Sequence, residues 1–240
     1  MRRISAFPKK PLRYFSMFET TEGFILHRTV FRNTSYVVDV LTRRFGRMSF
    51  MVRGARGEKS QFLGTLEFLN KISLTFRNNE AAELQTLRSA DVINDAFFLA
   101  ESSESYEMAG EMVKLIRKIV PEREPHENIY HIIDMFLKGM RAGKGQKALI
   151  YCLIKLADAL GWTLSMNQEC RCGDTSALTW FDVQHGSFSC DDCKIGVYAS
   201  DLYAFVRSIE QGDAREYTMS NDEFVIYHKL LLQYFEVHTR

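Results

Sequence analysis

The spacing of the hydrophobic residues changes once along the chain, near residue 90, and this change constrains the fold more than any other feature. Before it, apolar and polar residues alternate with a period of two, most regularly in Lys71–Arg77. After it, apolar residues recur every three to four positions, which is the helical period. The chain of 240 residues is therefore predicted to have a β-rich N-terminal part and a helical remainder.

The β-rich part is predicted to contain five short strands. They cover residues 23–31, 36–42, 47–53, 71–77 and 83–88, and turns rich in Arg, Asn and Gly separate them. Five short strands with tight connections are typical of a small closed barrel such as an OB-fold. We assign this barrel to residues 17–88, after a basic arm over residues 1–16.

The helical domain is assigned to residues 89–167 and 199–240, with an insertion at 168–198 between them. Residues 147–160 are apolar on nearly all sides, which predicts a central buried helix. A capping box at residues 220–223 predicts the start of the last helix. The expected fold class is α+β, with the barrel followed by an all-α domain that carries the insertion.

The insertion contains two close cysteine pairs, Cys170 with Cys172 and Cys190 with Cys193. Two such pairs predict a four-thiolate zinc site, which we interpret as structural because four cysteines close the coordination shell. The first pair has one intervening residue where zinc knuckles usually have two. Ligation by His185 in place of Cys170, and plain buried thiols without metal, stay open as alternatives. A disulfide conflicts with a cytosolic chain.

Charge divides the chain in the same place as the hydrophobic pattern. Residues 1–77 contain 15 Lys and Arg against 5 Asp and Glu, whereas residues 78–240 contain 16 against 25. A basic barrel is a candidate for binding a polyanion, and a solvated basic face without a ligand is the alternative.

The basic residues of the barrel gather in predicted turns, from which side chains reach phosphates. The candidate contact residues are Arg28, Arg32, Arg43, Arg44, Phe45, Arg47, Arg53, Arg56 and Lys59. Phe45, Phe50 and Phe62 are candidates for stacking on bases, with the barrel core as the alternative, which we favour for Phe50. This pattern does not distinguish DNA from RNA.

No catalytic residue is assigned, because the common hydrolase and phosphate-loop motifs are missing from the sequence. A metal-dependent nuclease or hydrolase with a nucleic-acid-binding barrel is the alternative function. Its densest candidate carboxylates are Asp174, Asp191 and Asp192. An RNA-binding barrel protein is a third interpretation.

Several segments, taken in order, resemble the RecO family of bacterial DNA repair and recombination mediators. They are residues 23–28, 37–42, 45–46, 53–56 and 59–60, followed by Leu160-Gly-Trp162 and the two cysteine pairs. The resemblance implies an OB-fold, a helical domain and a module with one zinc per chain. It also implies binding of single- and double-stranded DNA and annealing of complementary strands, without a chemical step.

The resemblance further implies partnership with RecR and with the single-stranded DNA-binding protein (SSB), and indirectly with RecA, which the protein helps to load. We expect the acidic helical domain to bind proteins, with an apolar groove for the acidic tail of SSB. Its candidate rim residues are Arg117, Lys118, Lys138 and Lys155. Without a signal peptide or a membrane span, a cytoplasmic, nucleoid-associated location is expected.

Overall fold

The computed structural model describes residues 18–79, 81–164, 169–174, 178–199 and 201–239, so the predicted arm at 1–16 lies outside the described residues. The barrel strands are β1 (Phe18–Phe31), β2 (Ser35–Thr42), β3 (Gly46–Val52), β4 (Lys71–Arg77) and β5 (Leu84–Asn94). The helices are η1 (Phe97–Glu101), α1 (Ser103–Ile119), α2 (Glu127–Arg141), α3 (Gly145–Ala159), α4 (Leu202–Gln211) and α5 (Asn221–His238). A small sheet consists of β6 (Leu178–Asp182), β7 (Ser187–Cys190) and β8 (Val197–Tyr198).

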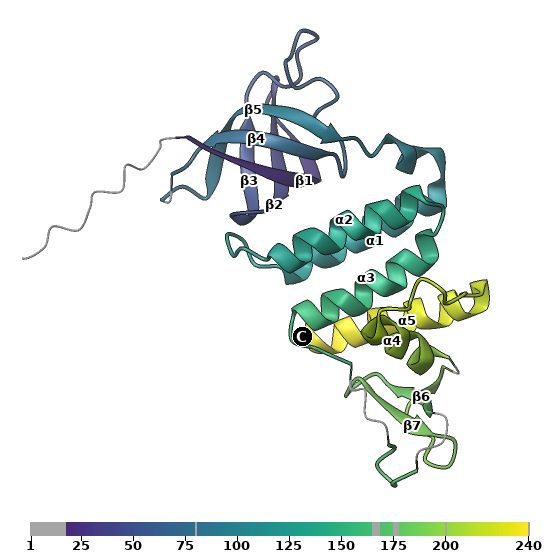
Figure 1. Cartoon of the computed structure of the whole chain (residues 1–240). Helices are drawn as coiled ribbons and strands as arrows, with labels where there is room; N and C mark the ends of the chain where they lie inside the picture. The colour runs from purple at the N-terminus through teal and green to yellow at the C-terminus, as the bar shows by residue number, and fades with distance from the viewer. Residues whose placement is uncertain (1–17, 80, 165–168, 175–177, 200, 240) are drawn as a thin grey trace, which may run out of the picture.

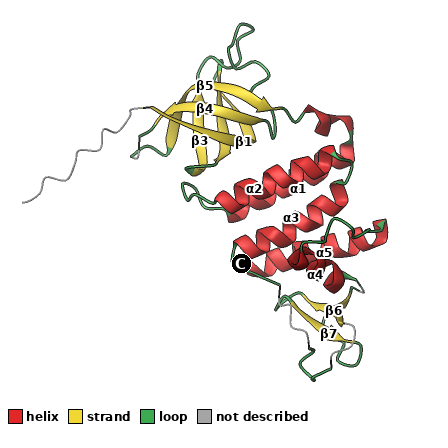
Figure 2. Cartoon of the chain, in the orientation of Figure 1, coloured by secondary structure: helices red, strands yellow, loops and turns green. Residues whose placement is uncertain are grey.

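These elements form three layers along the molecule. The barrel lies at one end, the helices lie in the middle, and the sheet of the cysteine insertion lies at the other end (Figures 1 and 2). The predicted fold class is therefore confirmed. None of the described helices is both long and apolar enough to cross a membrane.

The N-terminal part is a closed barrel with the strand order β1-β2-β3-β5-β4, as in an OB-fold. The β3 and β5 strands pair in parallel, and the other neighbours pair antiparallel. The alternation in β4 places Ile72, Leu74 and Phe76 in the barrel core, as its period of two predicts. The fifth strand runs to Asn94, six residues beyond its predicted end, because Val92 still pairs with Ile72 of β4.

The helical core is built around α3, whose residues are buried on most sides as predicted. The predicted capping box at the start of α5 is also confirmed. The Glu223 backbone N–H donates to Ser220 Oγ over 3.2 Å, and the Ser220 N–H donates to the Glu223 carboxylate over 2.7 Å. The fifth cysteine, Cys152, lies in this core, where burial raises the pKa of its thiol to about 12.

The barrel and the helices share one apolar interface. Phe24, Leu41 and Leu69 of the barrel belong to the same core cluster as the helices. The rings of Phe24 and Tyr130 of α2 lie 4.9 Å apart. The interface therefore fixes which end of the barrel faces the helices and which end faces solvent.

Gly46, the first residue of β3, lies close against the loop between α1 and α2. Its φ is +70°, and a Cβ atom would lie 2.1 Å from the Glu124 carbonyl oxygen. Gly54 has a similar φ of +67°, but a Cβ atom there would meet nothing within 4 Å.

We expect Gly54→Ala to lower the free energy of unfolding by about 1 kcal/mol, which is the cost of alanine in this backbone region. Gly46→Ala is expected to cost at least about 3 kcal/mol, because the clash with backbone adds to that strain. Denaturant unfolding of both variants checks this difference. Equal losses would show that the contact with Glu124 does not hold the barrel in place.

Candidate nucleic-acid interface and metal centre

The predicted basic contact residues lie at opposite ends of the barrel. We call the turn at 32–34 and the loop at 53–60 the distal end, which points away from the helices, and the turn at 43–45 the proximal end (Figure 1). The β2 strand, with 8 residues, separates these two ends. At 3.3 Å per residue, that strand is about 25 Å long. One short ligand therefore cannot contact all the predicted residues from one side.

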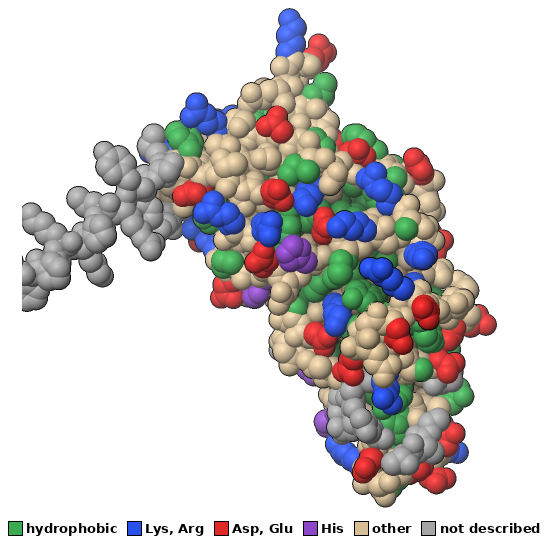
Figure 3. All heavy atoms as spheres, in the orientation of Figure 1, with side chains coloured by type: hydrophobic (Ala, Val, Ile, Leu, Met, Phe, Trp, Pro, Cys, Tyr) green, Lys and Arg blue, Asp and Glu red, His purple; other side chains and the backbone are tan. Residues whose placement is uncertain are grey.

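The distal end contains four Lys or Arg residues and one acid, Glu58. Arg56 links the loop at 53–60 to the turn at 32–34, because its Nη1 donates to the carbonyl oxygens of Arg32 and Asn33 over 3.1 and 3.0 Å. Arg53 and Lys59 are exposed, and no Asp or Glu among the described residues pairs with them. Figure 3 shows Lys or Arg side chains at this outer tip of the molecule. The distal end is therefore a rigid turn pair with uncompensated positive charge.

Two aromatic side chains that the sequence analysis missed lie beside these cations. Phe31 is 38% exposed, and the Arg32 guanidinium lies 5.3 Å from its ring centre. Tyr36 is half-buried, and the Arg28 guanidinium lies 4.7 Å from its ring centre while pairing with Glu67 at 2.7 Å. The signal in the sequence that could have identified these two rings is an aromatic residue within one or two positions of a basic turn.

The predicted stacking residues have other positions. Phe50 is in the barrel core, as favoured, and Phe62 is also buried there, which matches the core alternative for this residue. Phe45 is half-buried, with its ring against the edge of Phe76 at 5.4 Å and Arg44 over it at 5.1 Å. Packing in the barrel therefore occupies most of the Phe45 ring.

The proximal cations are neutralised by acids of the same molecule. Arg43 pairs with Glu127 of α2 at 2.8 Å, and this hydrogen bond raises the pKa of Arg43 and lowers that of Glu127. Arg44 is 60% exposed and lies 3.6 Å from the Glu19 carboxylate. The proximal end thus has less uncompensated charge than the distal end.

Arg47 is part of the interface between the barrel and α1. Its guanidinium contacts Asp39 at 3.1 Å and Glu122 at 3.2 Å, and only 15% of the side chain is exposed. Arg117 of α1, a predicted rim residue, contacts the same Asp39 oxygen at 2.9 Å. This geometry leaves Arg47 no open side for a phosphate, so we exclude it from the interface proposed below.

The four cysteines of the insertion converge on one point. Their sulfur atoms all lie within 4.8 Å of one another, and the sulfurs of Cys172 and Cys190 are 3.6 Å apart. Tetrahedral zinc with Zn–S bonds of about 2.3 Å places its sulfurs about 3.8 Å apart, whereas a disulfide needs about 2.05 Å. The arrangement fits one metal ion and excludes a disulfide between these two residues.

The short first pair is accommodated by a tight turn. The Gly173 N–H donates to the Cys170 carbonyl over 2.8 Å, with the glycine at a φ of +86°. Backbone N–H groups of Cys172 and Cys190 lower the pKa of the Cys170 thiol to about 6. The thiolate is the form that binds a metal. Cys170 therefore has the geometry of a ligand despite the one-residue spacing.

The alternative ligand His185 and one alternative catalytic acid, Asp191, have other partners. The ring of His185 bonds the Asp182 carboxylate at 2.8 Å, and it is not part of the sulfur cluster. Asp191 accepts hydrogen bonds from Thr179 and Trp180, which fasten the second cysteine turn to β6. Among the described residues, the four cysteines are the one group of three or more His, Cys, Asp or Glu residues that could hold an ion.

The comparisons with known proteins decide the family. Family models described as "Recombination protein O N terminal" and "Recombination protein O C terminal" match residues 17–96 and 102–240. The chain belongs to the RecO family. This confirms the resemblance and makes the chain a member of a DNA repair and recombination family.

Individual relatives agree with the RecO assignment. The DNA repair protein RecO of Listeria monocytogenes serotype 4b is 24% identical over 176 residues, covering 73% of this chain and 68% of the relative. The protein of the same name from Anaeromyxobacter is 26% identical over 178 residues, covering 73% and 70%. That of Bacillus pumilus is 24% identical over 175 residues, covering 72% and 67%.

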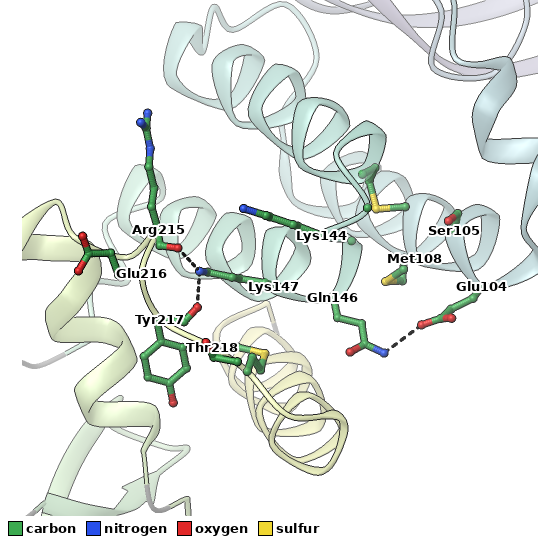
Figure 4. Close-up of a pocket in the computed structure, with 14 residues that line it drawn as sticks. Glu104, Ser105, Met108, Lys144, Gln146, Lys147, Arg215, Glu216, Tyr217 and Thr218 are labelled. Atoms are coloured by element: carbon green, nitrogen blue, oxygen red, sulfur yellow. Dashed lines mark hydrogen bonds between the residues drawn. The ribbon is translucent and has the colours of Figure 1, made fainter.

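The helical domain of this RecO-family chain has two adjoining hollows. A cleft of about 560 Å³ and a trough of about 360 Å³ share Lys144, Lys147 and Arg215 (Figure 4). Lys147 donates to the carbonyl oxygens of Arg215 and Tyr217, and burial lowers its pKa. No Asp or Glu among the described residues forms an ion pair with these three cations. The other lining residues of the trough are Met135, Gly139, Ala148, Tyr151, Ile209, Gly212 and Ala214.

None of the four predicted rim residues lines these two hollows. Lys118 donates to Thr239 over 3.0 Å, and Lys138 pairs with Asp134 at 2.6 Å. Lys155 pairs with Asp158 at 3.4 Å, and Arg117 is bound to Asp39 as described. These side chains have partners within the molecule, a property that their positions in the sequence did not reveal.

Proposed function

We propose that this chain is a non-enzymatic DNA repair and recombination mediator that binds single- and double-stranded DNA and anneals complementary strands. With RecR it helps to load RecA onto strands coated by SSB, in the cytoplasm at the nucleoid. The observation that supports this proposal is the distal end of the barrel, which gathers Arg32, Arg53, Arg56 and Lys59 and where the exposed Phe31 ring lies beside Arg32. In OB-folds, the loop between the first two strands is part of the oligonucleotide-binding surface.

The chemistry of the distal end fits a strand held without sequence preference. Guanidinium and ammonium groups contact phosphates, which carry no sequence information. The exposed Phe31 offers a ring face on which any base can stack. Annealing requires two strands to be held against their mutual repulsion, and it needs no nucleophile. Arg28 lies beside Tyr36 but pairs with Glu67. Like Arg43, Arg44 and Phe45, it therefore contributes less to this surface, because it has an intramolecular partner.

We propose that the metal held by Cys170, Cys172, Cys190 and Cys193 is zinc and that its role is structural. Four thiolates leave zinc no open position for a water molecule, which a catalytic zinc needs. Cys170 and Cys190 lie in the same apolar cluster as the helices. The metal therefore fastens the insertion to the helical domain.

Annealing of two complementary labelled oligonucleotides tests the proposed function. The protein should accelerate duplex formation, and both labelled strands should stay at full length with and without Mg²⁺. A labelled strand that is shortened in the presence of Mg²⁺ would favour the nuclease. Stronger competition by RNA than by DNA of equal length would favour the RNA-binding interpretation.

The trough in the helical domain is the proposed site for the acidic tail of SSB. Its apolar wall can bury hydrophobic side chains, and Lys144, Lys147 and Arg215 can pair with carboxylates, including the terminal one. An anion beside Lys147 would also offset the burial that lowers the pKa of this residue. The trough thus replaces the predicted rim residues as the site for this partner.

We expect Lys144→Glu with Arg215→Glu to weaken binding of a peptide from the SSB C-terminus at least about 10-fold, because each reversal replaces attraction by repulsion. Lys229→Glu is a matched control, since Lys229 is exposed on the outer side of α5. Fluorescence anisotropy of a labelled peptide measures both. Equal affinities for the double variant and the wild type would place the tail elsewhere.

A further inference from the structure

The stretch from residue 89 to residue 113 has the most one-sided charge in the chain, with six Asp or Glu and no Lys or Arg. It covers the end of β5, the short helix η1 and about the first two-thirds of α1. In Figure 1 these elements lie at the corner where the barrel joins the helices. Neither the proposed DNA surface nor the proposed SSB site uses this stretch.

Large apolar side chains are exposed within the same stretch. Phe97 is 58% exposed and Tyr106 is 52% exposed. The Tyr106 ring lies 5.4 Å from that of Phe68, in the loop before β4. The Asn70 side chain ties that loop to the stretch, because its amide donates to the Gly64 carbonyl and accepts from the Ala96 N–H, each over 3.0 Å. Large exposed aromatic side chains within one short stretch of chain fit an interaction site.

Acids without an ion pair lie within five positions of these rings in the sequence. Among the described residues, the carboxylates of Asp95, Glu101 and Glu107 pair with no Lys or Arg. Arg141 donates to the Asp95 carbonyl oxygen over 2.7 Å, and Lys71 and Lys138 line the same hollow as Asp95. We call Phe68, Phe97, Tyr106, Asp95, Glu101 and Glu107 the acidic apolar patch. A matching partner must be basic and rich in apolar side chains.

Residues 1–17 of this chain have that composition. They contain five Lys or Arg, three aromatic residues and no Asp or Glu. They join the barrel at Phe18, which pairs with Arg77 at one end of β4, while Asn94 at the patch pairs with Lys71 at the other end. The distance along β4 is about 20 Å, and 17 extended residues span up to about 56 Å. The length of this segment is therefore sufficient to reach the patch and to lie across it.

We propose that residues 1–17 dock on the acidic apolar patch of the same chain. Their basic side chains pair with Asp95, Glu101 and Glu107, and their aromatic side chains cover Phe97 and Tyr106. The docked segment withholds its five positive charges from DNA, so that contact with DNA is left to the barrel.

Photo-cross-linking in the full chain tests this docking. Phe97 is replaced by p-benzoylphenylalanine, and a matched variant carries the same residue at Val237, which is 41% exposed on α5. Mass spectrometry of the irradiated monomer should find peptides from residues 1–17 attached at position 97, at least about 10-fold above position 237. In 1 M NaCl, where charges are screened beyond about 3 Å, the yield should fall several-fold.

Charge reversal separates this docking from chance contact. Asp95→Lys with Glu101→Lys and Glu107→Lys should lower the yield at position 97 about as much as high salt does. Reversing Lys9, Lys10 and Arg13 to Glu in the same chain should restore it. The proposal would be overturned by a folded monomer in which position 97 forms no cross-link to residues 1–17. It would also be overturned if position 97 cross-linked two chains into a dimer instead, or if charge reversal left the cross-linking yield unchanged.

Discussion

Replacing Cys190 and Cys193 together by serine is expected to remove the metal and to unfold the insertion. Purified wild-type protein should contain about one zinc per chain, and the double variant should contain almost none. Structural zinc binds with an apparent free energy of about 10–16 kcal/mol, and this energy is folding energy for the small module around it. Metal analysis together with proteolysis of the insertion measures both effects.

Cys152→Ala is the matched control for this prediction. It also removes a cysteine, but Cys152 is buried in α3 and bonds the Ile132 carbonyl rather than the cluster. Its zinc content should equal that of the wild type, although the loss of packing lowers the stability. Full zinc retention in the double serine variant would defeat the assignment of these four ligands.

The second large effect concerns DNA affinity. Arg53→Ala with Lys59→Ala is expected to weaken binding of single-stranded DNA about 100-fold at 50 mM salt, since each phosphate contact contributes roughly 10-fold there. Neither side chain forms an ion pair within the described molecule, so the fold should be unaffected. Titration of a labelled oligonucleotide measures the loss, which should be similar for all sequences.

Arg43→Ala with Arg44→Ala removes the same two charges at the proximal end and is the matched control. Its effect should be below about 5-fold, because Glu127 and Glu19 already neutralise these side chains. A larger loss from the proximal pair than from the distal pair would move the DNA to the other end of the barrel.

The barrel and the helices could be predicted because their signals are local. The alternation in β4 and the capping box before α5 each depend on residues a few positions apart. The end of β5 was missed because Val92 and Asn94 are held by pairing with Ile72 and Lys71, which lie 20 or more positions earlier. The two-residue strand β8 was missed for the same reason, since it exists only through pairing with β6.

The metal site could be predicted from the sequence because two close cysteine pairs at this spacing are typical of metal ligands. The distribution of the barrel cations was only partly visible. Two turns that flank one strand must lie at opposite ends of it, so the separation of Arg32 from Arg43 follows from the predicted strands alone. The partners that neutralise Arg43 and Arg47, such as Glu127 and Glu122, lie more than 70 positions away. Tertiary contacts of that kind leave no local pattern.

The salt dependence of DNA binding tests most directly whether the distal end holds the DNA. With four phosphate contacts on a single strand, the logarithm of the affinity should fall with the logarithm of salt concentration with a slope of about −2.8. In the Arg53→Ala and Lys59→Ala variant the slope should flatten to about −1.4, and in the Arg43→Ala and Arg44→Ala variant it should stay near the wild-type value. An unchanged slope in the folded distal variant would contradict the account, because the phosphates would then be bound elsewhere on the protein.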